Sequence, residues 1–350
     1  MQDGPELRID PLTGLRVVLA PRRSERPLSF QPSEVHAQAR ELCPLCEGRE
    51  DQTPPETWAL RPGGGAPDTP GWLVRAVPNK YPLLEHRPST TEAAGGSGAG
   101  ATKSDPPDPL AEGRGDPQFF SSAPAIGVHE VIVHAPEHLS SMSDLTADQM
   151  SLAIDGWKAR ASALAADSSY VHIMVNEGQA AGASLEHTHA QAYGLGFVPT
   201  IVARERERFN AHNTRTMGGC LLCDLLQEEI RRRERVIAVD EEAVLLAPYA
   251  ARAPYELQLV PRAHEARFAD AAVTGARLLH DGLNRLRRVL GGPPPLNLWV
   301  RTAPRGADSF HWHIDVVPRL TQLAGFELGT GVNVNIVAPD RAAAELRDAG

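Results

Sequence analysis

The sequence predicts an α+β protein made of two similar halves in tandem, each an antiparallel sheet with a packed helix. The first observation behind this is an ordered set of cysteines and histidines that occurs twice along the chain. The second is a helical pattern followed by an apolar strand, which stands between corresponding histidines in both halves. We therefore expect one duplicated unit, with residues 1–195 forming the first half and residues 196–350 the second.

The repeated segments align closely. Residues 129–138 end in a histidine and match residues 255–264 without a gap. From that histidine to a His-x-His motif the interval is 49 residues in the first half and 47 in the second. The first half is longer because it contains a tract, Glu85 to Ser122, that is rich in Gly, Ser, Pro, Ala and Thr. We expect this tract to be a disordered insertion, because it offers too few apolar groups to fold.

The elements between the histidines follow in the same order in each half. A capped helix is predicted over residues 144–164, and its partner runs from about Asp270 to Leu290, where two glycines and three prolines stop it. Residues 171–175 and 296–300 are short apolar runs that predict buried strands. Each half is therefore expected to be strand, helix, strand.

The composition excludes several classes of protein. A chain of 350 residues with 42% hydrophobic residues can bury a full core. Its formal charge of −9 disfavours a nucleic-acid coat, which needs a basic face. No apolar run approaches the ~18 residues of a membrane span, and the N-terminal residues lack the pattern of a signal peptide. We expect a cytoplasmic protein with neither nucleic acid nor membrane as a partner.

The cysteines form two Cys-x-x-Cys pairs, a spacing that lets both thiolates reach one Zn²⁺ ion. A redox pair is the competing interpretation, but neither pair stands between a strand and a helix. With the repeated histidines, each half offers four protein ligands, which closes the coordination shell and indicates a structural site. The predicted zinc ligands are Cys43, Cys46, His138 and His187 in the first half, and Cys220, Cys223, His264 and His311 in the second.

The second histidine of the first His-x-His motif, His189, is a candidate nucleophile. Residues i and i+2 of a strand share a face, so His187 can hold zinc while His189 projects into a cleft beside Gln191. The preceding loop contains Gly178 and Gly182, which let backbone N–H groups approach an anion. An imidazole beside such a loop suits nucleophilic attack on phosphorus through a phosphoramidate intermediate.

The segment Gly182–Gln191 resembles the active-site strand of the histidine-triad superfamily, and more narrowly that of the galactose-1-phosphate uridylyltransferase family. Triad hydrolases have a third histidine where this chain has Gln191, whereas the transferases use glutamine. The resemblance covers nearly the whole chain and implies two histidine-triad-like halves, the second degenerate, in a homodimer. The other matching segments are Arg8–Gly14, Ala20–Pro27, Val77–Pro82 and Val260–His264.

The resemblance also implies roles for single residues in a ping-pong nucleotidyl transfer. His189 would attack the α-phosphorus of a nucleoside-diphosphate sugar and expel a sugar 1-phosphate, and a second phosphate would then collect the nucleotidyl group. Gln191 would hydrogen-bond the phosphoryl oxygens. The implied substrate-binding residues are Arg23, Arg26, Asn79, Asn176 and Ser184.

Three departures from the family pattern bear on specificity. Thr188 stands where the galactose enzymes usually have proline. Cys220 and Cys223 resemble the two-zinc plant ADP-glucose phosphorylase type rather than a form in which Glu and three His hold iron, so we leave Glu205 outside the second metal site. The second His-x-His motif lacks a glutamine two residues later, which indicates a half kept for metal and for building the pocket.

The leading hypothesis is a transferase that converts UDP-glucose and galactose 1-phosphate to glucose 1-phosphate and UDP-galactose. The alternative is a nucleotide-sugar phosphorylase, acting on ADP-glucose with inorganic phosphate through the same histidine. A triad dinucleotide hydrolase fits less well because of Gln191. A zinc-stabilised binding module would need no nucleophile at all.

Overall fold

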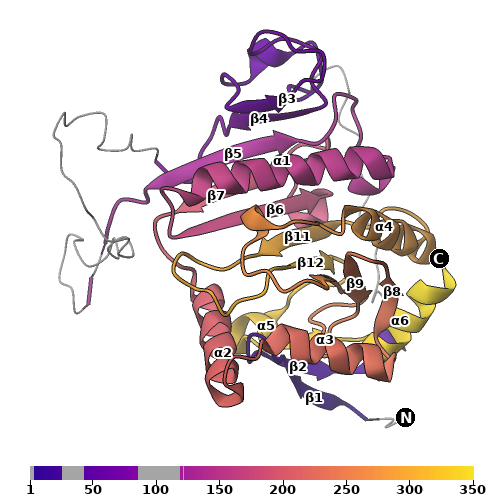
Figure 1. Ribbon diagram of the computed structural model, residues 1–350. Helices are drawn as coiled ribbons and strands as arrows, with labels where there is room; N and C mark the ends of the chain where they lie inside the picture. The colour runs from indigo at the N-terminus through magenta and orange to yellow at the C-terminus, as the bar shows by residue number, and fades with distance from the viewer. Residues whose placement is uncertain (1–3, 26–42, 86–118, 121) are drawn as a thin grey trace.

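The computed structural model describes residues 4–25, 43–85, 119–120 and 122–350, and in this part of the chain six α-helices surround two sheets (Figure 1). Every strand pair of the large sheet is antiparallel. This confirms the predicted combination of helices with an antiparallel sheet. In spatial order the ten strands are β3 (Trp58–Leu60), β4 (Val74–Pro78), β5 (Gly127–Val133), β7 (His189–Leu195), β6 (Tyr170–Glu177), β11 (Leu296–Arg301), β12 (His313–Pro318), β10 (Leu257–Pro261), β9 (Ala243–Leu246) and β8 (Val236–Val239).

The order of these strands is the same from both edges of the sheet. From one edge it runs β3-β4-β5-β7-β6, and from the other β8-β9-β10-β12-β11. The two series meet where β6 pairs with β11, with Met174 opposite Trp299. A continuous ladder of backbone hydrogen bonds therefore joins the first and second halves of the chain into one sheet.

Two long helices cover one face of this sheet, α1 (Ala147–Ala165) over the first series and α4 (Ala276–Leu290) over the second (Figure 1). Helix α1 begins where predicted, because Thr146 and Gln149 form a capping box. Helix α4 begins six residues after the predicted Asp270. A 3₁₀ turn ends at Asp270, and Gly275, with φ of 64°, redirects the chain just before the helix. Its end at Leu290, followed by Gly291, is as predicted.

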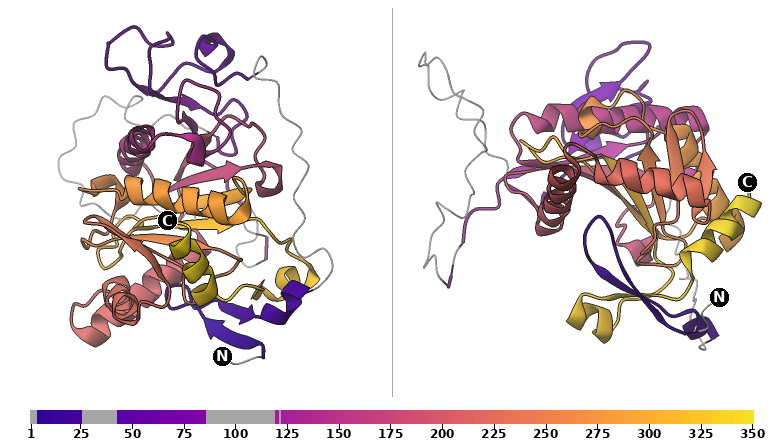
Figure 2. Two further views of the ribbon diagram at one scale, coloured as in Figure 1. Left: turned by 90° about the vertical axis from the view of Figure 1, so that its right-hand side faces the viewer. Right: turned by 60° about the horizontal axis from the view of Figure 1, so that its bottom comes forward.

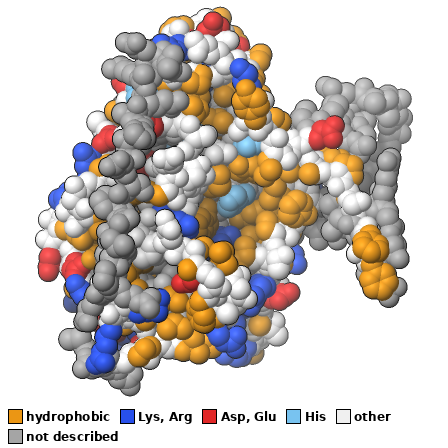
Figure 3. All heavy atoms as spheres, turned by 180° about the vertical axis from the view of Figure 1, so that it is seen from behind, with side chains coloured by type: hydrophobic (Ala, Val, Ile, Leu, Met, Phe, Trp, Pro, Cys, Tyr) orange, Lys and Arg blue, Asp and Glu red, His pale blue; other side chains and the backbone are white. Residues whose placement is uncertain are grey.

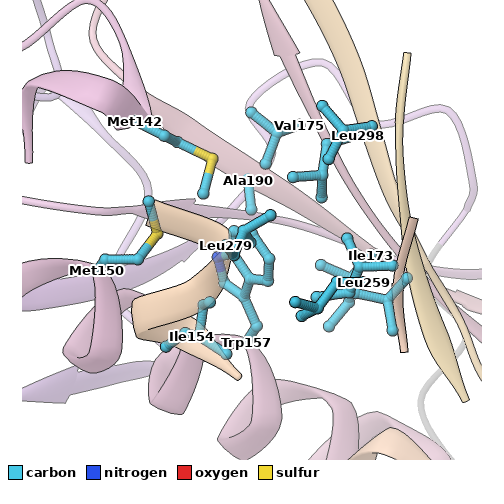
Figure 4. Close-up of a cluster of buried hydrophobic side chains, with 14 of the residues drawn as sticks. Met142, Met150, Ile154, Trp157, Ile173, Val175, Ala190, Leu259, Leu279 and Leu298 are labelled. Carbon is cyan, nitrogen blue, oxygen red and sulfur yellow. The ribbon is translucent and has the colours of Figure 1, made fainter. Parts of the chain in front are cut away.

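Buried apolar side chains fill the space between these helices and the sheet (Figure 4). Trp157 and Ile154 of α1 lie with Ile173 of β6 in one cluster, which continues through Leu279 of α4 to Leu259 of β10. This single core spans both halves, so the two series of strands are held together by packing as well as by hydrogen bonds.

On the opposite face, among the described residues, α-helices cover only the second series, while at one end of the first series Val133 of β5 is buried against Cys43, Leu45 and Trp72. Helices α2 (Thr200–Thr216) and α3 (Leu221–Arg232) pack on the second series, and Val244 and Leu246 of β9 join a second cluster with Phe209 and Leu222. In the first series β6 alternates instead: Ile173 and Val175 are buried under α1, whereas His172, Met174 and Asn176 are only half-buried. Seen from this side, the surface is hollowed and exposes histidine and apolar side chains (Figure 3). The open face of β5, β7 and β6 is where polar residues can meet a ligand.

The small sheet consists of β1 (Glu6–Ile9), β2 (Arg16–Leu19) and β13 (Asn333–Asn335). The pair β2 and β13 is parallel, unlike the antiparallel pairs we expect, because β13 arrives from far along the chain with no hairpin to reverse it. A strand from the first part of the chain therefore pairs with one from the last part, and α5 (Gly325–Thr330) and α6 (Pro339–Asp348) flank β13 in sequence (Figure 2).

Most of the tract from Glu85 to Ser122, predicted to be a disordered insertion, lies outside the described residues. Among the described helices, none has the length and apolar composition needed to cross a membrane.

Candidate active site and two metal clusters

Folding brings the four predicted ligands of the first half together. Cys43 Sγ lies 3.6 Å from His187 Nδ1, and Cys46 Sγ lies 3.4 Å from His138 Nδ1. A tetrahedral zinc ion with its usual bond lengths would hold sulfur and nitrogen ligands about 3.5 Å apart. His187 Nε2 donates a 2.9 Å hydrogen bond to the carbonyl of Ala135, which leaves Nδ1 for a metal. These residues fit one metal ion with a closed shell.

The second half repeats this cluster. Cys220 Sγ lies 3.7 Å from His311 Nδ1, and Cys223 Sγ lies 3.7 Å from His264 Nδ1. The two imidazole rings meet edge to face at 5.1 Å, against 5.3 Å for the corresponding pair in the first half. The same four ligand types thus converge twice, at separations that suit the same kind of ion.

The candidate metal ligands His187 and His311 are not strand residues, contrary to the expectation that the first His-x-His motif lies within a strand. β7 begins at His189 and β12 begins at His313, so His187 and His311 stand just before these strands. At these positions Nδ1 of each ring lies 3.4–3.7 Å from the two cysteine sulfurs of its cluster. What links the two histidines of the first motif is instead a hydrogen bond.

His189 is held in one orientation and one tautomer by that bond. Its Nδ1 lies 2.7 Å from the carbonyl oxygen of His187, and a carbonyl can only accept, so Nδ1 carries the proton. Burial lowers the pKa of His189 and favours the neutral ring. The unprotonated Nε2 therefore keeps its lone pair, which is what a nucleophilic imidazole requires.

Gln191 follows His189 on the same face of β7, and its amide is firmly held. Its Oε1 lies 2.9 Å from His129 Nε2 of β5 and accepts a 2.7 Å hydrogen bond from the hydroxyl of Tyr193. The side chain of Asn79 also approaches this imidazole, with Asn79 Nδ2 lying 3.0 Å from His129 Nε2. The predicted residues Asn79 and Gln191 thus meet through His129, which our sequence analysis does not single out.

Asn176 and the small-residue loop lie at the end of β6. Asn176 Oδ1 accepts a 2.7 Å hydrogen bond from Asn297, and Asn297 also donates to the carbonyl of Ala181 in the loop. Gly178 and Gly182 both have positive φ, at 77° and 87°, as a backbone cradle requires. These bonds tie the loop to the central pair of strands, and the side chain of Ser184 on the same loop is exposed.

Of the two arginines predicted to bind substrate, Arg23 is the one among the described residues. Arg23 lies on the 3₁₀ turn Pro21–Glu25, which follows β2, and its backbone N–H bonds to the carbonyl of Ala20. Its side chain is exposed beside the small sheet, which packs on second-half residues such as Ala250. Arg26 lies outside the described residues.

The second His-x-His motif opens onto a buried ionic cluster rather than onto an open face. His313 Nε2 lies 3.4 Å from Glu205 Oε1, and Arg301 Nε lies 3.8 Å from the other carboxylate oxygen. Asp315, which takes the place of a glutamine, lies close to Arg252 at 3.1 Å. Glu205 is not one of the four convergent ligands of the second cluster, and burial raises its pKa to about 8.

Sequence comparison places the chain among nucleotide-sugar enzymes. The family model described as galactose-1-phosphate uridyl transferase, N-terminal domain, matches residues 101–199. ADP-glucose phosphorylase of Arabidopsis thaliana is 29% identical over 359 residues, which span 98% of this chain and 93% of that protein. Galactose-1-phosphate uridylyltransferase of Streptomyces lividans is 30% identical over 255 residues, which span 66% of this chain and 72% of the relative.

Comparison with solved structures leads to the same group of enzymes as the sequence comparison. The crystal structure of the Arabidopsis thaliana ADP-glucose phosphorylase with bound ADP-glucose superposes with a TM-score of 0.76 at 26% identity, covering 99% of both chains. The fold, the histidine motif and these relatives define an enzyme of the nucleotidyltransferase class. The chain belongs to the galactose-1-phosphate uridylyltransferase family.

Proposed function

We propose that the protein transfers a nucleoside monophosphate from a nucleotide sugar to a second phosphate through a covalent intermediate on His189. The single observation that carries this proposal is the 2.7 Å hydrogen bond from His189 Nδ1 to the carbonyl of His187. It leaves Nε2 unprotonated beside Gln191, on the open face of the sheet. We place the phosphates beside the loop that contains Gly178 and Gly182, which is held in shape by hydrogen bonds from its own N–H groups at Ala181, Gly182 and Ala183.

In the first step, Nε2 of His189 forms a bond to the α-phosphorus, and the bond from that phosphorus to the sugar-phosphate oxygen breaks. The sugar 1-phosphate leaves with the bonding electrons. Positive charge develops on the ring, and the bond from Nδ1–H to the His187 carbonyl strengthens and stabilises it. In the second step, an oxygen of the acceptor phosphate attacks the same phosphorus, the P–N bond breaks and His189 is regenerated.

Zinc is the metal we assign to both clusters, two ions per chain, because two thiolates and two imidazoles suit a tetrahedral ion. Zinc supplies structural rigidity there, since four protein ligands leave no position for water. We further propose two histidine-triad-like units, residues 1–195 and 196–350, a view supported by the matching strand order from both edges of the sheet. The second unit is catalytically degenerate, and the enzyme acts in the cytoplasm as a homodimer.

Two substrate pairs fit this chemistry. The first is UDP-glucose with galactose 1-phosphate, supported by uridylyltransferase relatives from several organisms. The second is ADP-glucose with inorganic phosphate, supported by the Arabidopsis thaliana relative and by the Cys₂His₂ composition of the second cluster. Ser184, Asn79, Asn176, Arg23 and Arg26 are the proposed substrate contacts in either case.

The test is to incubate the protein with UDP-glucose or ADP-glucose labelled in the α-phosphate, without any acceptor. We expect label bound through an acid-labile, base-stable linkage, lost in His189→Ala and kept in His313→Asn, the matched change in the second motif. Equal labelling of His189→Ala would overturn the covalent mechanism. Release of label by galactose 1-phosphate identifies the transferase, and release by inorganic phosphate identifies the phosphorylase.

A further inference from the structure

The amide of Gln191 has only one end free for a ligand. Its oxygen accepts two hydrogen bonds, from the hydroxyl of Tyr193 at 2.7 Å and from Nε2 of His129 at 2.9 Å. A carboxamide oxygen has two lone pairs, so these two donors occupy both. The NH₂ group is then the end that can serve a bound molecule, and it can only donate.

The donor role of His129 follows from its other nitrogen. His129 Nδ1 lies 3.2 Å from the backbone N–H of Leu83, which can only donate, so Nδ1 must accept and the proton must sit on Nε2. Burial lowers the pKa of His129, which favours the neutral ring that this pattern needs. Asn79 Nδ2 lies 3.0 Å from the same Nε2, but the oxygen of Asn79 accepts from the N–H of Tyr81, so this is a contact between two donors rather than a hydrogen bond.

The strand register holds this arrangement rigid. His129 on β5 pairs directly with Tyr193 on β7, and the two rings stack at 4.1 Å with an angle of 21° between them. Both side chains are buried, at 8% and 9% exposure, and from this position the imidazole reaches Gln191 diagonally across the pair of strands. A flexible glutamine is thereby reduced to one rotamer and one amide orientation.

We propose that His129, with Tyr193, is a positioning residue that presents the NH₂ of Gln191 as a hydrogen-bond donor to the transferring phosphoryl group. This inference rests on the proposed function, since it names how that site recognises an anionic phosphate rather than a hydroxyl or a cation. A glutamine turned the other way would aim its oxygen at the phosphate oxygens and repel them. Because His129 and Tyr193 fix the amide before the substrate binds, this unfavourable orientation is avoided, and no free energy is spent on turning the amide during the reaction.

The test is a double-mutant cycle on the rate of nucleotidyl-enzyme formation in a single turnover at saturating nucleotide sugar. His129→Phe keeps an aromatic ring against Tyr193 without the donor, and Tyr193→Phe removes only the hydroxyl. We expect each to slow the step by about 5- to 20-fold, with a smaller change in the half-saturating concentration. In a Gln191→Ala background, His129→Phe should cost nothing further, within about twofold.

The matched control is His172→Phe, a histidine on the other side of Tyr193 whose ring lies 6.3 Å from it and which, among the described residues, forms no hydrogen bond with Gln191. This variant should leave the rate within about twofold of the parent. If His129→Phe slows the step as much without Gln191 as with it, His129 does not act through Gln191 and the proposal is wrong.

A second measurement needs no activity. The ¹⁵N NMR spectrum of the imidazole should show His129 as the Nε2–H tautomer, with its Nε2 resonance displaced in Gln191→Ala. An Nδ1–H tautomer would overturn the positioning role. If neither nucleotide sugar labels the wild-type protein, the proposed function fails, and the tautomer still decides whether His129 orients Gln191.

Discussion

The hydroxyl of Thr188 donates a 3.1 Å hydrogen bond to the buried carboxyl group of Glu177. The same hydroxyl lies 3.0 Å from His134 Nδ1, and His134 Nε2 accepts from the indole of Trp157, so Nδ1 donates to Thr188. This chain of bonds runs beneath the segment that joins His187 to His189. The residue that departs from the family's usual proline therefore anchors the motif from behind, which a proline side chain could not do.

Thr188→Val should destabilise the fold, because it leaves a buried donor on His134 without a partner and removes one of the hydrogen bonds to the buried carboxyl group of Glu177, which keeps those from Met142 and Ser141. We expect a loss of about 1–3 kcal/mol in the free energy of unfolding, measured by urea denaturation. Thr188→Ser keeps the hydroxyl and should recover most of the loss. If serine and valine destabilise equally, the methyl group rather than the hydrogen bonds is what matters.

Stability should depend on pH through Glu205, whose pKa is raised to about 8 by burial. The folded state then holds a proton that the unfolded state, with an ordinary glutamate pKa near 4.5, releases. Folding stability is therefore highest below about pH 4.5 from this group alone and declines as pH rises toward 8, by at most about 1.4 kcal/mol per pH unit. Urea unfolding between pH 5 and 8 should show a flatter profile for Glu205→Gln than for the wild type. The exposed Glu207→Gln on the same helix is the control, and an unchanged slope in Glu205→Gln would contradict the assignment.

The two metal clusters should be separable by mutation. The wild-type protein should contain two zinc ions per chain by elemental analysis, and Cys43→Ser or Cys220→Ser should each remove one. Loss of the first ion should reduce nucleotidyl transfer about 10- to 100-fold, because the carbonyl of His187 orients His189. Loss of the second should mainly lower the melting temperature. A wild-type content of one ion or none would argue against the repeated site.

Gly156 lies where α1 packs tightly against β3 and β4 of the sheet. A Cβ placed there would lie 2.8 Å from Val74 Cγ1 and 3.3 Å from the ring of Trp58. Although alanine favours a helix, Gly156→Ala should therefore destabilise the protein, by about 1–3 kcal/mol in urea unfolding. Gly325→Ala, where a Cβ meets nothing within 4 Å, is the matched control and should be neutral or slightly stabilising. A more stable Gly156→Ala protein would mean that α1 shifts freely on the sheet.

The metal ligands were accessible to sequence reasoning because their pattern is local and repeated. Cysteines three residues apart must share one turn of chain, and a second copy at matching intervals makes coincidence improbable. The helix over Ala147–Ala165 and the strand Tyr170–Glu177 were accessible for a similar reason, since capping and apolar periodicity report local conformation. The onset of α4 was misplaced, because a positive φ at Gly275 leaves only a weak signal in the pattern.

The role of His129 could not be read in this way. It meets Gln191 across 62 residues of chain, and that meeting depends on the register of β5 against β7. A period of two along β7 does extend from His189 through Gln191 to Tyr193, and this signal could have drawn attention to Tyr193. Nothing local in the sequence says which residue of another strand lies opposite.

The amino-acid sequence by itself determined which cysteines and histidines gather in two clusters, which histidine we propose as the nucleophile and much of the order of the elements, because these depend on residue type and short spacing. Only the tertiary structure decided which face of the sheet stays partly open, since α2 and α3 pack on the second series of strands, whereas in the described part of the chain that face of β5, β7 and β6 has only the Cys43–Trp72 cluster at one end. It also decided that His313 is enclosed with Glu205 while His189 stands beside the open face. Burial and hydrogen-bond partners are properties of packed neighbours, and those neighbours come from distant parts of the chain.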